Sequence, residues 1–534
     1  MSWHQSTARK RIEKLISDAP HIEVEKFNDD YLPLYKQNMI KNDALGNART
    51  PPLFGLPLGK AIVVDTVQVY VNIVNYDDYK IDDGQETEAA HAKALKFLHF
   101  HYSACDRVME TSAAQRVDFH DGRMHAVIID TTGEGVTDKT IADAFAFIRD
   151  LRWVANQANN RLAKNRFTAK FRVGVDIGPC VAINNGTGTE QEPMFLGSPA
   201  NHAAKLACGD EAGIYVSDKV RLKFNIVGLG DSEALKRLDE SVFENIVMTK
   251  NLTEGLQFNE EQVPRGLDDI LSNWNRDIIN GNFPNPTNPN FAFGYKEPPL
   301  KEIDFADLMP SNSIRMPLAS LFADLSGFTN YVDNSIAKGE IADAVKALYV
   351  IRQELQHVLE DDFGGRKVRF IGDCIHGLIA IGTKDAIDPS KTIINTAACA
   401  GGLRDSFELC QMLLRNIHQL GLAIGVEYGE TPISRIGIRG DRSVRIASSL
   451  ATTKSERLQQ ECGLNDTKFG PNALHIMPAS LIDLIDHNGL TANLSYDDVV
   501  DGSVMGDLVD LTAPYNKTLS NRPVEKPRAH AKLK

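Results

Sequence analysis

The chain has 534 residues, of which 43% are hydrophobic and 24% are charged, and its formal net charge is −13 at pH 7. This length exceeds the size at which one hydrophobic core keeps growing, so we expect two or three domains, and the negative charge disfavours binding to nucleic acid. The longest apolar runs are too short to cross a bilayer, and the seven scattered cysteines form no CxxC pair, which argues against a disulfide framework and a zinc site.

Residues 1–59 are predicted to form a leader, with a helix over residues 8–17 and an irregular stretch at residues 49–52. The first eleven residues lack the apolar segment of a secretory signal. The expected compartment is therefore the cytoplasm, and no membrane partner is expected.

A first domain is predicted over residues 60–255. Its hydrophobic pattern indicates, in order, a strand, a helix, a hairpin that turns at Asp121-Gly122, a second helix and a further strand. This order is typical of a ferredoxin-like palm, in which two helices cover one face of an antiparallel sheet. The expected elements span residues 61–75, 86–109, 117–130, 141–162 and 169–178.

An Asn- and Pro-rich linker is predicted over residues 256–313, because its run at residues 283–290 cannot sustain a helix or a central strand. The same order of elements then returns in a second domain over residues 314–515, before a basic tail at residues 516–534. This repeat predicts an α+β protein with two tandem palms that pair as an intramolecular pseudo-dimer. The second set spans residues 318–325, 341–359, 366–381, 399–420 and 421–428, and its hairpin turns at Gly372-Asp373.

Two aspartates in the second domain are candidate metal ligands. Asp324 lies near the end of an apolar strand, before a small-residue turn into a helix whose backbone amides suit phosphate binding. Asp373 lies at the hairpin turn, 373 − 324 = 49 residues later, so neighbouring strands would bring the two acids together. Two carboxylates beside a phosphate-binding turn suit a two-ion Mg²⁺ or Mn²⁺ site. The alternative is a turn aspartate and a helix-capping aspartate, each common by itself, although an unpaired carboxylate beside so apolar a strand is costly.

Residues 322–329 (Phe-Ala-Asp-Leu-Ser-Gly-Phe-Thr), with residues 370–373 (Phe-Ile-Gly-Asp) at this spacing, resemble the catalytic domain of class III adenylate/guanylate cyclases. The resemblance covers roughly residues 60–250 and 314–515. It implies the palm fold and metal binding by both aspartates. It also implies a site at a dimer interface, where the partner domain supplies the base-reading and transition-state residues.

In the first domain, Asn72 and Gly122 align with the two acids, so this domain is not expected to hold metal. Asp121 is one position away and is a candidate substitute, although a hairpin-turn aspartate is the simpler interpretation. Residues 195–206 resemble the family segment in which an Asn orients the ribose and a basic residue stabilises the transition state. Asn201 and Lys205 occupy these positions, four residues apart on a predicted helix. The alternative is a helix-start Asn and a surface Lys.

The family alignment also places Asp118 and Met194 near the nucleobase. In the second domain, it places Arg445 and Ser449 where the family has the Asn and the basic residue. Each domain therefore lacks what the other has, and one complete site is expected per chain.

The resemblance implies attack of the ribose 3′-oxygen on the α-phosphorus of a nucleoside triphosphate, with release of pyrophosphate and a 3′,5′-cyclic nucleotide. The backbone amides of Gly327, Phe328 and Thr329 are candidates to hold the phosphates. Asp118 and Met194 disfavour ATP, because adenylate cyclases of this family pair a Lys with an Asp or Thr there. An acidic acceptor suits the N–H of guanine or uracil or the amino group of cytosine, so hydrogen bonding alone leaves the base open.

Residues 370–377 and 433–440 look similar to bacterial pyrimidine cyclases of Pycsar antiphage systems, which favours UTP. That similarity implies synthesis triggered by phage infection and a separately encoded effector that binds the cyclic nucleotide. Two alternatives stay open: a purine cyclase in ordinary signalling, and a non-catalytic pseudocyclase that senses nucleotides.

Overall fold

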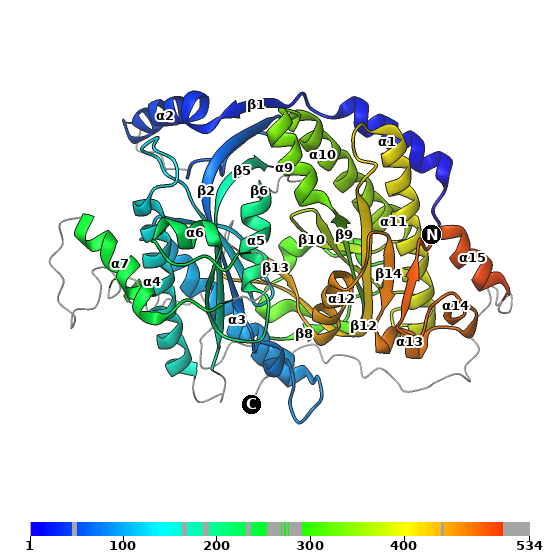
Figure 1. Cartoon of the computed structure of the whole chain (residues 1–534). Helices are drawn as coiled ribbons and strands as arrows, with labels where there is room; N and C mark the ends of the chain where they lie inside the picture. The colour runs from blue at the N-terminus through cyan, green and yellow to red at the C-terminus, as the bar shows by residue number, and fades with distance from the viewer. Residues whose placement is uncertain are drawn as a thin grey trace.

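The computed structural model describes residues 2–44, 51–162, 168–184, 192–230, 236–253, 269, 272–273, 276, 291–438 and 443–505. The Asn/Pro run at residues 283–290 and the basic tail at residues 516–534 lie outside the described residues. Two curved sheets stand side by side, one in each half of the chain (Figure 1). This arrangement confirms the predicted α+β fold with two tandem palms.

The first half holds a seven-stranded sheet within the described residues, with the strand order β3-β4-β2-β5-β6. Strands β1 and β7 add to it by parallel pairing with β2 and β5. The elements are α1 (Gln5–Asp18), β1 (Glu23–Lys26), α2 (Leu32–Ala44), β2 (Lys60–Ile73), α3 (Glu88–Met109), β3 (Ala114–His120), β4 (Arg123–Ile128), α4 (Asp138–Leu162), β5 (Phe171–Asn184), β6 (Pro193–Leu196), α5 (Ser198–Ala207), β7 (Gly213–Val216), α6 (Asp218–Lys223) and α7 (Glu240–Thr253).

The second half repeats this plan with an eight-stranded sheet in the part of the chain described, in the order β10-β11-β9-β12-β14-β15. Here β8 and β13 add to the sheet beside β9 and β12. The elements are β8 (Phe293–Gly294), β9 (Ser313–Ser326), α9 (Phe328–Lys338), α10 (Ile341–His357), β10 (Arg366–Ile371), β11 (Cys374–Ile379), α11 (Pro389–Leu413), β12 (Gly421–Ile436), β13 (Val444–Ala447), α12 (Leu450–Gln460), β14 (Asp466–Phe469), α13 (Pro471–Ile476), α14 (Ala479–Ile482), β15 (Leu490–Ala492) and α15 (Tyr496–Met505).

One predicted helix differs from the observed one. The pattern predicted a helix over residues 399–420, whereas α11 begins at Pro389 and ends at Leu413. Asp388 caps its start by accepting a hydrogen bond from the backbone N–H of Lys391, and Pro389 suits the first helical position. Past the helix end, the Gln411 side chain donates a 2.8 Å hydrogen bond to the carbonyl of Leu420. Asp388 and Pro389 therefore mark the start of this helix, ten residues before the predicted one.

Each half extends a short arm into the other half. The arm of the first half is the end of β5 with β6, and the arm of the second half is the end of β12 with β13. Val181, Met194 and Leu196, from the end of β5 and from β6, are buried in the core of the second half. Reciprocally, Ile436 and Val444, from β12 and β13, are buried in the core of the first half. Because each arm is buried in the opposite core, the two halves form one packed unit.

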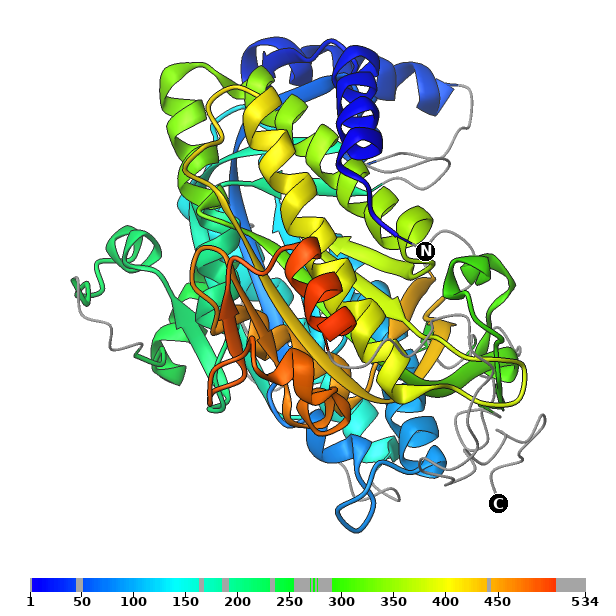
Figure 2. The same ribbon diagram turned by 90° about the vertical axis from the view of Figure 1, so that its right-hand side faces the viewer.

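The leader contacts both halves. Helix α1 packs on α10 and α11 of the second half, and it lies across them in Figure 2. The chain then crosses to the first half, where β1 pairs with the beginning of β2. Beyond the Asn/Pro run, the buried residues Phe305 and Leu308 join a core cluster beside β9. The domain limits drawn from the sequence stay a prediction.

Candidate active site

Asp324 lies near the end of β9, the strand at the centre of the second sheet, between β11 and β12. The chain leaves this strand through Gly327, whose φ of 84° lies in the left-handed region that glycine adopts without strain. Helix α9 begins at the next residue, so its first backbone N–H groups lack partners within the helix. The Phe328 side chain is 4% exposed and belongs to the core, which leaves only its backbone available to a ligand.

Asp373 lies in the two-residue turn between β10 and β11, after Gly372 at φ 61°. Strand β11 pairs with β9 so that Ile375 is opposite Ala323. When this register is extended by one residue, Cys374 at the start of β11 lies opposite Asp324. Asp373 directly precedes Cys374, so the two acids are neighbours. The antiparallel pairing of neighbouring strands therefore brings the two acids to one place, as the sequence predicted.

The electrostatic environment of the two acids favours a bound cation. Burial raises the pKa of Asp324 to about 6, and the charge of Glu456 adds to this effect. Burial also raises the pKa of Asp373 well above its ordinary value, and the charge of Asp324 is the next cause. Two carboxylates buried together destabilise each other when both are ionised, and a cation between them removes that cost.

The donor set fits Mg²⁺ or Mn²⁺ bound together with a triphosphate. Among the residues that the structure describes, no group of three or more His, Cys, Asp or Glu side chains is arranged to hold a metal ion. Mg²⁺ is commonly held by one or two carboxylates together with substrate phosphates and water. Two aspartates beside the start of α9 supply that number of carboxylates.

Helix α5 of the first half lies against the start of α9. The Asn201 side-chain amide donates a hydrogen bond of 2.5 Å to the Thr329 hydroxyl, across the interface between the halves. Three residues earlier, the backbone N–H of Ser198 donates to the Asp333 carboxylate at 3.0 Å. Lys205 is exposed one turn farther along α5, and its side chain makes no hydrogen bond or ion pair to any described residue. Asn201 of the first half thus touches the predicted phosphate-binding turn of the second.

Asp118 lies on β3 and also reaches across the interface. Its carboxylate forms a 2.6 Å ion pair with the buried guanidinium of Arg369 on β10. Arg369 in turn donates to the backbone carbonyls of Phe119 and Arg445. Asp118 keeps a side-chain exposure of 37%, so it remains open to a ligand.

Met194 lies on β6 with its sulfur 2.6 Å from the guanidinium of Arg352. The Arg352 side chain is 2% exposed, stacks over the Phe370 ring at 4.0 Å and pairs with Glu192 at 2.5 Å. Burial lowers the pKa of Arg352, and the Glu192 carboxylate opposes that effect. Met194 is thus part of a buried interface between the halves.

Comparisons with known proteins show the family of the chain and its fold. No protein-family model matches the chain. A uridylate cyclase from a Rhizobium species is 42% identical over 90% of this chain and 92% of that protein, and a uridylate cyclase from Pseudomonas aeruginosa is 32% identical over 94% and 91%. The chain belongs to the uridylate cyclase family. A solved class III adenylyl cyclase-like ATP-binding protein from Pseudomonas aeruginosa has a TM-score of 0.82 and 31% identity over 94% of this chain and 100% of that chain.

The resemblance of this uridylate cyclase family member to class III nucleotidyl cyclases is thereby confirmed. No helix among the described residues is long and apolar enough to span a membrane.

One alignment made from the sequence is wrong. Gly174 and Gly425 occupy equivalent places, because a Cβ at either would lie about 2 Å from a helix carbonyl, that of Ala203 or of Ser455. Ala203 and Ser455 are therefore equivalent. Asn201 and Thr453 lie two residues before them, and Lys205 and Arg457 lie two residues after them, so each of these pairs is equivalent as well. Arg445 and Ser449 therefore do not occupy the positions assigned to them. They lie before α12, on β13 and at the helix N-cap.

Sequence reasoning missed the partners of the predicted residues. Arg369, Arg352 and Glu192 escaped notice, although a charged residue inside an apolar strand or helix pattern is itself a signal of a buried ion pair. Tyr70 on β2 was also missed. Burial raises its pKa, and the charges of Asp118 and Asp373 act in the same direction.

Proposed function

We propose that this chain converts UTP to 3′,5′-cyclic UMP and pyrophosphate at one site built from both halves. The observation that carries the proposal is the hydrogen bond from Asn201 on α5 to Thr329, which joins the turn after Asp324 to the opposite half. The shared length and identity with two uridylate cyclases support the choice of reaction and of uracil.

In this proposal Asp324 and Asp373 hold two divalent cations, Mg²⁺ or Mn²⁺. When bound, such cations neutralise the triphosphate and lower the pKa of the attacking 3′-hydroxyl. The backbone amides of Gly327, Phe328 and Thr329 hold phosphate oxygens at the start of α9. Asn201 orients the ribose, and Lys205 stabilises the charge that develops at the α-phosphorus. Removing one such contact typically costs about 3 kcal/mol of transition-state stabilisation.

The base site is proposed at Asp118 and Met194. Arg369 keeps the Asp118 carboxylate in place as a hydrogen-bond acceptor, which suits the N3–H of uracil. The amino group of cytosine is an equally suitable donor, so the assignment of uracil rests on the relatives. ATP is the second candidate, because the solved structure with a TM-score of 0.82 is that of an ATP-binding protein.

The test is incubation of the purified full chain with Mn²⁺ and each of UTP, CTP, ATP and GTP, followed by chromatographic identification of the products. We expect cyclic UMP from UTP, and no product from any nucleotide with the Asp373→Asn variant. Cyclic AMP as the main product would overturn the uracil assignment. Full activity of the Asp373→Asn variant would overturn the metal assignment.

We further propose, from the resemblance to pyrimidine cyclases of antiphage systems, that the product is a cytoplasmic second messenger read by a separately encoded effector. The expected observation is a rise in cyclic UMP after phage infection of cells that carry the wild-type chain, and no rise with the Asp373→Asn variant. An unchanged level in both strains would contradict this role.

A further inference from the structure

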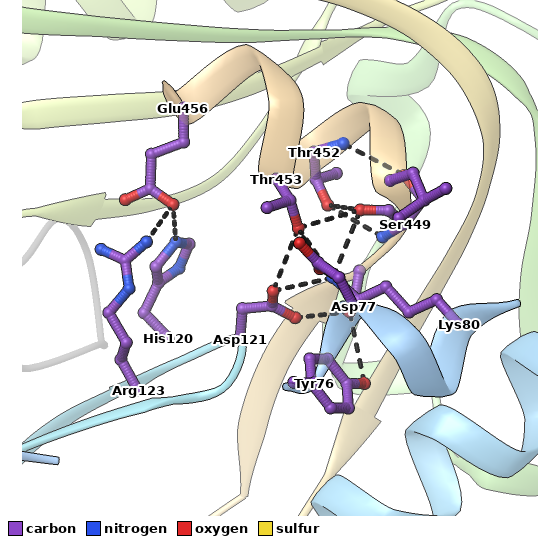
Figure 3. Close-up of polar contacts among 12 residues, drawn as sticks. Tyr76, Asp77, Lys80, His120, Asp121, Arg123, Ser449, Thr452, Thr453 and Glu456 are labelled. Atoms are coloured by element: carbon purple, nitrogen blue, oxygen red, sulfur yellow. Dashed lines mark hydrogen bonds and ion pairs between the residues drawn. The ribbon is translucent and has the colours of Figure 1, made fainter. Parts of the chain in front are cut away.

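The pseudo-symmetric counterpart of the candidate active site is filled by the protein's own side chains (Figure 3). It lies between the β3–β4 hairpin and residues 76–80 of the first half and helix α12 of the second half. At its centre is Lys80, whose side chain is fully buried. Its ammonium lies 2.9 Å from Asp121, 3.0 Å from Asp77, 2.8 Å from the Thr453 hydroxyl and 3.3 Å from the Ser449 carbonyl.

Further contacts in this cluster cross between the halves. The Ser448 hydroxyl donates to Asp121 at 2.5 Å, and the Thr453 hydroxyl donates to Asp77 at 3.0 Å. Nearby, the Glu456 carboxylate accepts from Arg123 at 2.5 Å. The buried ammonium of the first half is thus surrounded by oxygen atoms of both halves.

The places of these residues match those of the candidate active site. Asp77 is the counterpart of Thr329, since Asn72 and Asp324 lie at equivalent points of β2 and β9. Because Thr453 is the counterpart of Asn201, the contact between Thr453 and Asp77 repeats the contact between Asn201 and Thr329. Lys80 touches both members of this second contact, because its ammonium donates to the Thr453 hydroxyl and lies 3.0 Å from Asp77.

The backbone of the hairpin carries a second sign of specialisation. Asp121 has a φ of 48°, and its counterpart Gly372 has a φ of 61°. A left-handed residue other than glycine is sterically unfavourable, although Asp tolerates it better than most. A residue held there against this cost is well explained by the contacts that its side chain makes with Lys80 and Ser448.

The charges of the cluster balance without a ligand. Three carboxylates, those of Asp77, Asp121 and Glu456, face three cations, those of Lys80, Arg123 and Arg457. Burial alone would lower the pKa of Lys80, but the carboxylates of Asp121 and Asp77 outweigh burial and raise it. A nucleoside triphosphate would meet no surplus positive charge among these six groups.

We propose that this second pseudo-site is a permanent clamp between the halves, in which Lys80 is a positioning residue that fixes α5 relative to Asp324 and Asp373 for catalysis. The clamp occupies the place of a second ligand, so each chain binds one nucleotide. The catalytic part of this inference rests on the proposed cyclase function, whereas the clamp itself rests on the contacts alone.

The test compares Lys80→Met with Arg116→Met. Arg116 forms 2.8 and 2.9 Å contacts with the buried Asp106, so its loss also removes a cation from a buried carboxylate, and this pair lies within the first half. We expect Lys80→Met to lower kcat by about 10- to 100-fold, because Asn201 and Lys205 lose their alignment with the metal acids. Arg116→Met lowers the melting temperature but leaves kcat within about twofold of wild type at temperatures well below melting.

Three further measurements separate a clamp from a general loss of stability. Mn²⁺ affinity is expected to stay unchanged in Lys80→Met, since both acids belong to the second half. Amide hydrogen exchange in residues 444–460 is expected to increase in Lys80→Met and not in Arg116→Met, and this readout needs no cyclase activity. Thr453→Val, a milder change of similar shape, is expected to show the same pattern to a smaller degree.

Unchanged kcat and unchanged exchange in Thr453→Val and Lys80→Met would overturn the clamp, as would binding of two nucleotides per chain in calorimetry with a non-hydrolysable UTP analogue. If Lys80→Met does not fold, Thr453→Val alone decides. Absence of any cyclic product from the wild-type chain would refute the proposed function, while the exchange measurement would still decide the clamp.

Discussion

The carboxylate of Asp324, the proposed metal ligand, is held in the folded chain at a cost to stability. Its pKa of about 6 in the folded chain, against an ordinary 3.8, means that the folded state binds the proton more tightly than the unfolded state. The stabilisation from this group is therefore present at low pH and is lost as pH rises through about 6. The shift corresponds to at most about 3 kcal/mol at neutral pH.

We expect the Asp324→Asn variant to be more stable than wild type in EDTA at pH 7.5, with a difference of a few degrees in melting temperature that shrinks towards pH 5. Mn²⁺ should raise the melting temperature of wild type and have little effect on the variant. The measurement is thermal denaturation at both pH values, with the exposed Asp78→Asn as a control that should match wild type. A variant less stable than wild type at pH 7.5 would contradict the electrostatic account.

At the same scale, the sequence was informative where one local pattern carries the chemistry. Asp324 and Asp373 were predicted because each lies in a recognisable strand-and-turn motif, and the pairing of β9 with β11 brings them together. The pairing of Asp118 with Arg369 could not be predicted, because 369 − 118 = 251 residues separate them and only the packing of the two halves makes them neighbours. The alignment of Arg445 and Ser449 was wrong for a similar reason. Only the close packing of α12 on Gly425 shows which residues are equivalent.

Among the elements, α1 shows how a segment outside the catalytic repeat supports the arrangement. Its Arg11 makes two hydrogen bonds of 2.6 and 2.7 Å to Glu354 and lies 2.9 Å from Asp362, both of the second half. The Glu354 side chain is fully buried and also accepts from Ser406. The pattern predicted a helix over residues 8–17. It could not predict that this helix packs on α10 and α11, because an apolar helix face does not indicate which element it packs against.

We expect Arg11→Met to lower the free energy of unfolding by about 3–5 kcal/mol, because it leaves the buried Glu354 carboxylate without its cation. Arg9→Met provides the matched control on the same helix. The Arg9 pair with Glu13 is half-exposed, and such pairs contribute about 0.3–0.5 kcal/mol. Chemical denaturation of both variants measures the two changes. Equal effects would show that the contact of α1 with the second half contributes nothing specific.

For the whole molecule, the exchange of arms decides how the active site is assembled. Met194 and Leu196 are buried in the second core, while Ile436 and Val444 are buried in the first, so separating the halves would expose apolar surface on both. The partner of each half is therefore the other half of the same chain. The two halves also differ in their proposed roles, because the second half carries Asp324 and Asp373 and the first half carries Asn201 and Lys205.

This arrangement predicts the result of mixing two inactive variants. Asp324→Ala is expected to disable the second half, and Lys205→Met the first. The first variant keeps an intact Lys205, and the second keeps an intact Asp324. If the site forms within one chain, an equimolar mixture should stay as inactive as its components, because no subunit exchange can unite an intact Asp324 with an intact Lys205. A double variant carrying both changes in one chain, mixed with wild type, controls for inhibition in the mixture. If two chains exchanged halves at random, the mixture would recover about a quarter of the wild-type rate of cyclic nucleotide synthesis. Recovery at that level would show that the arms exchange between chains rather than within one.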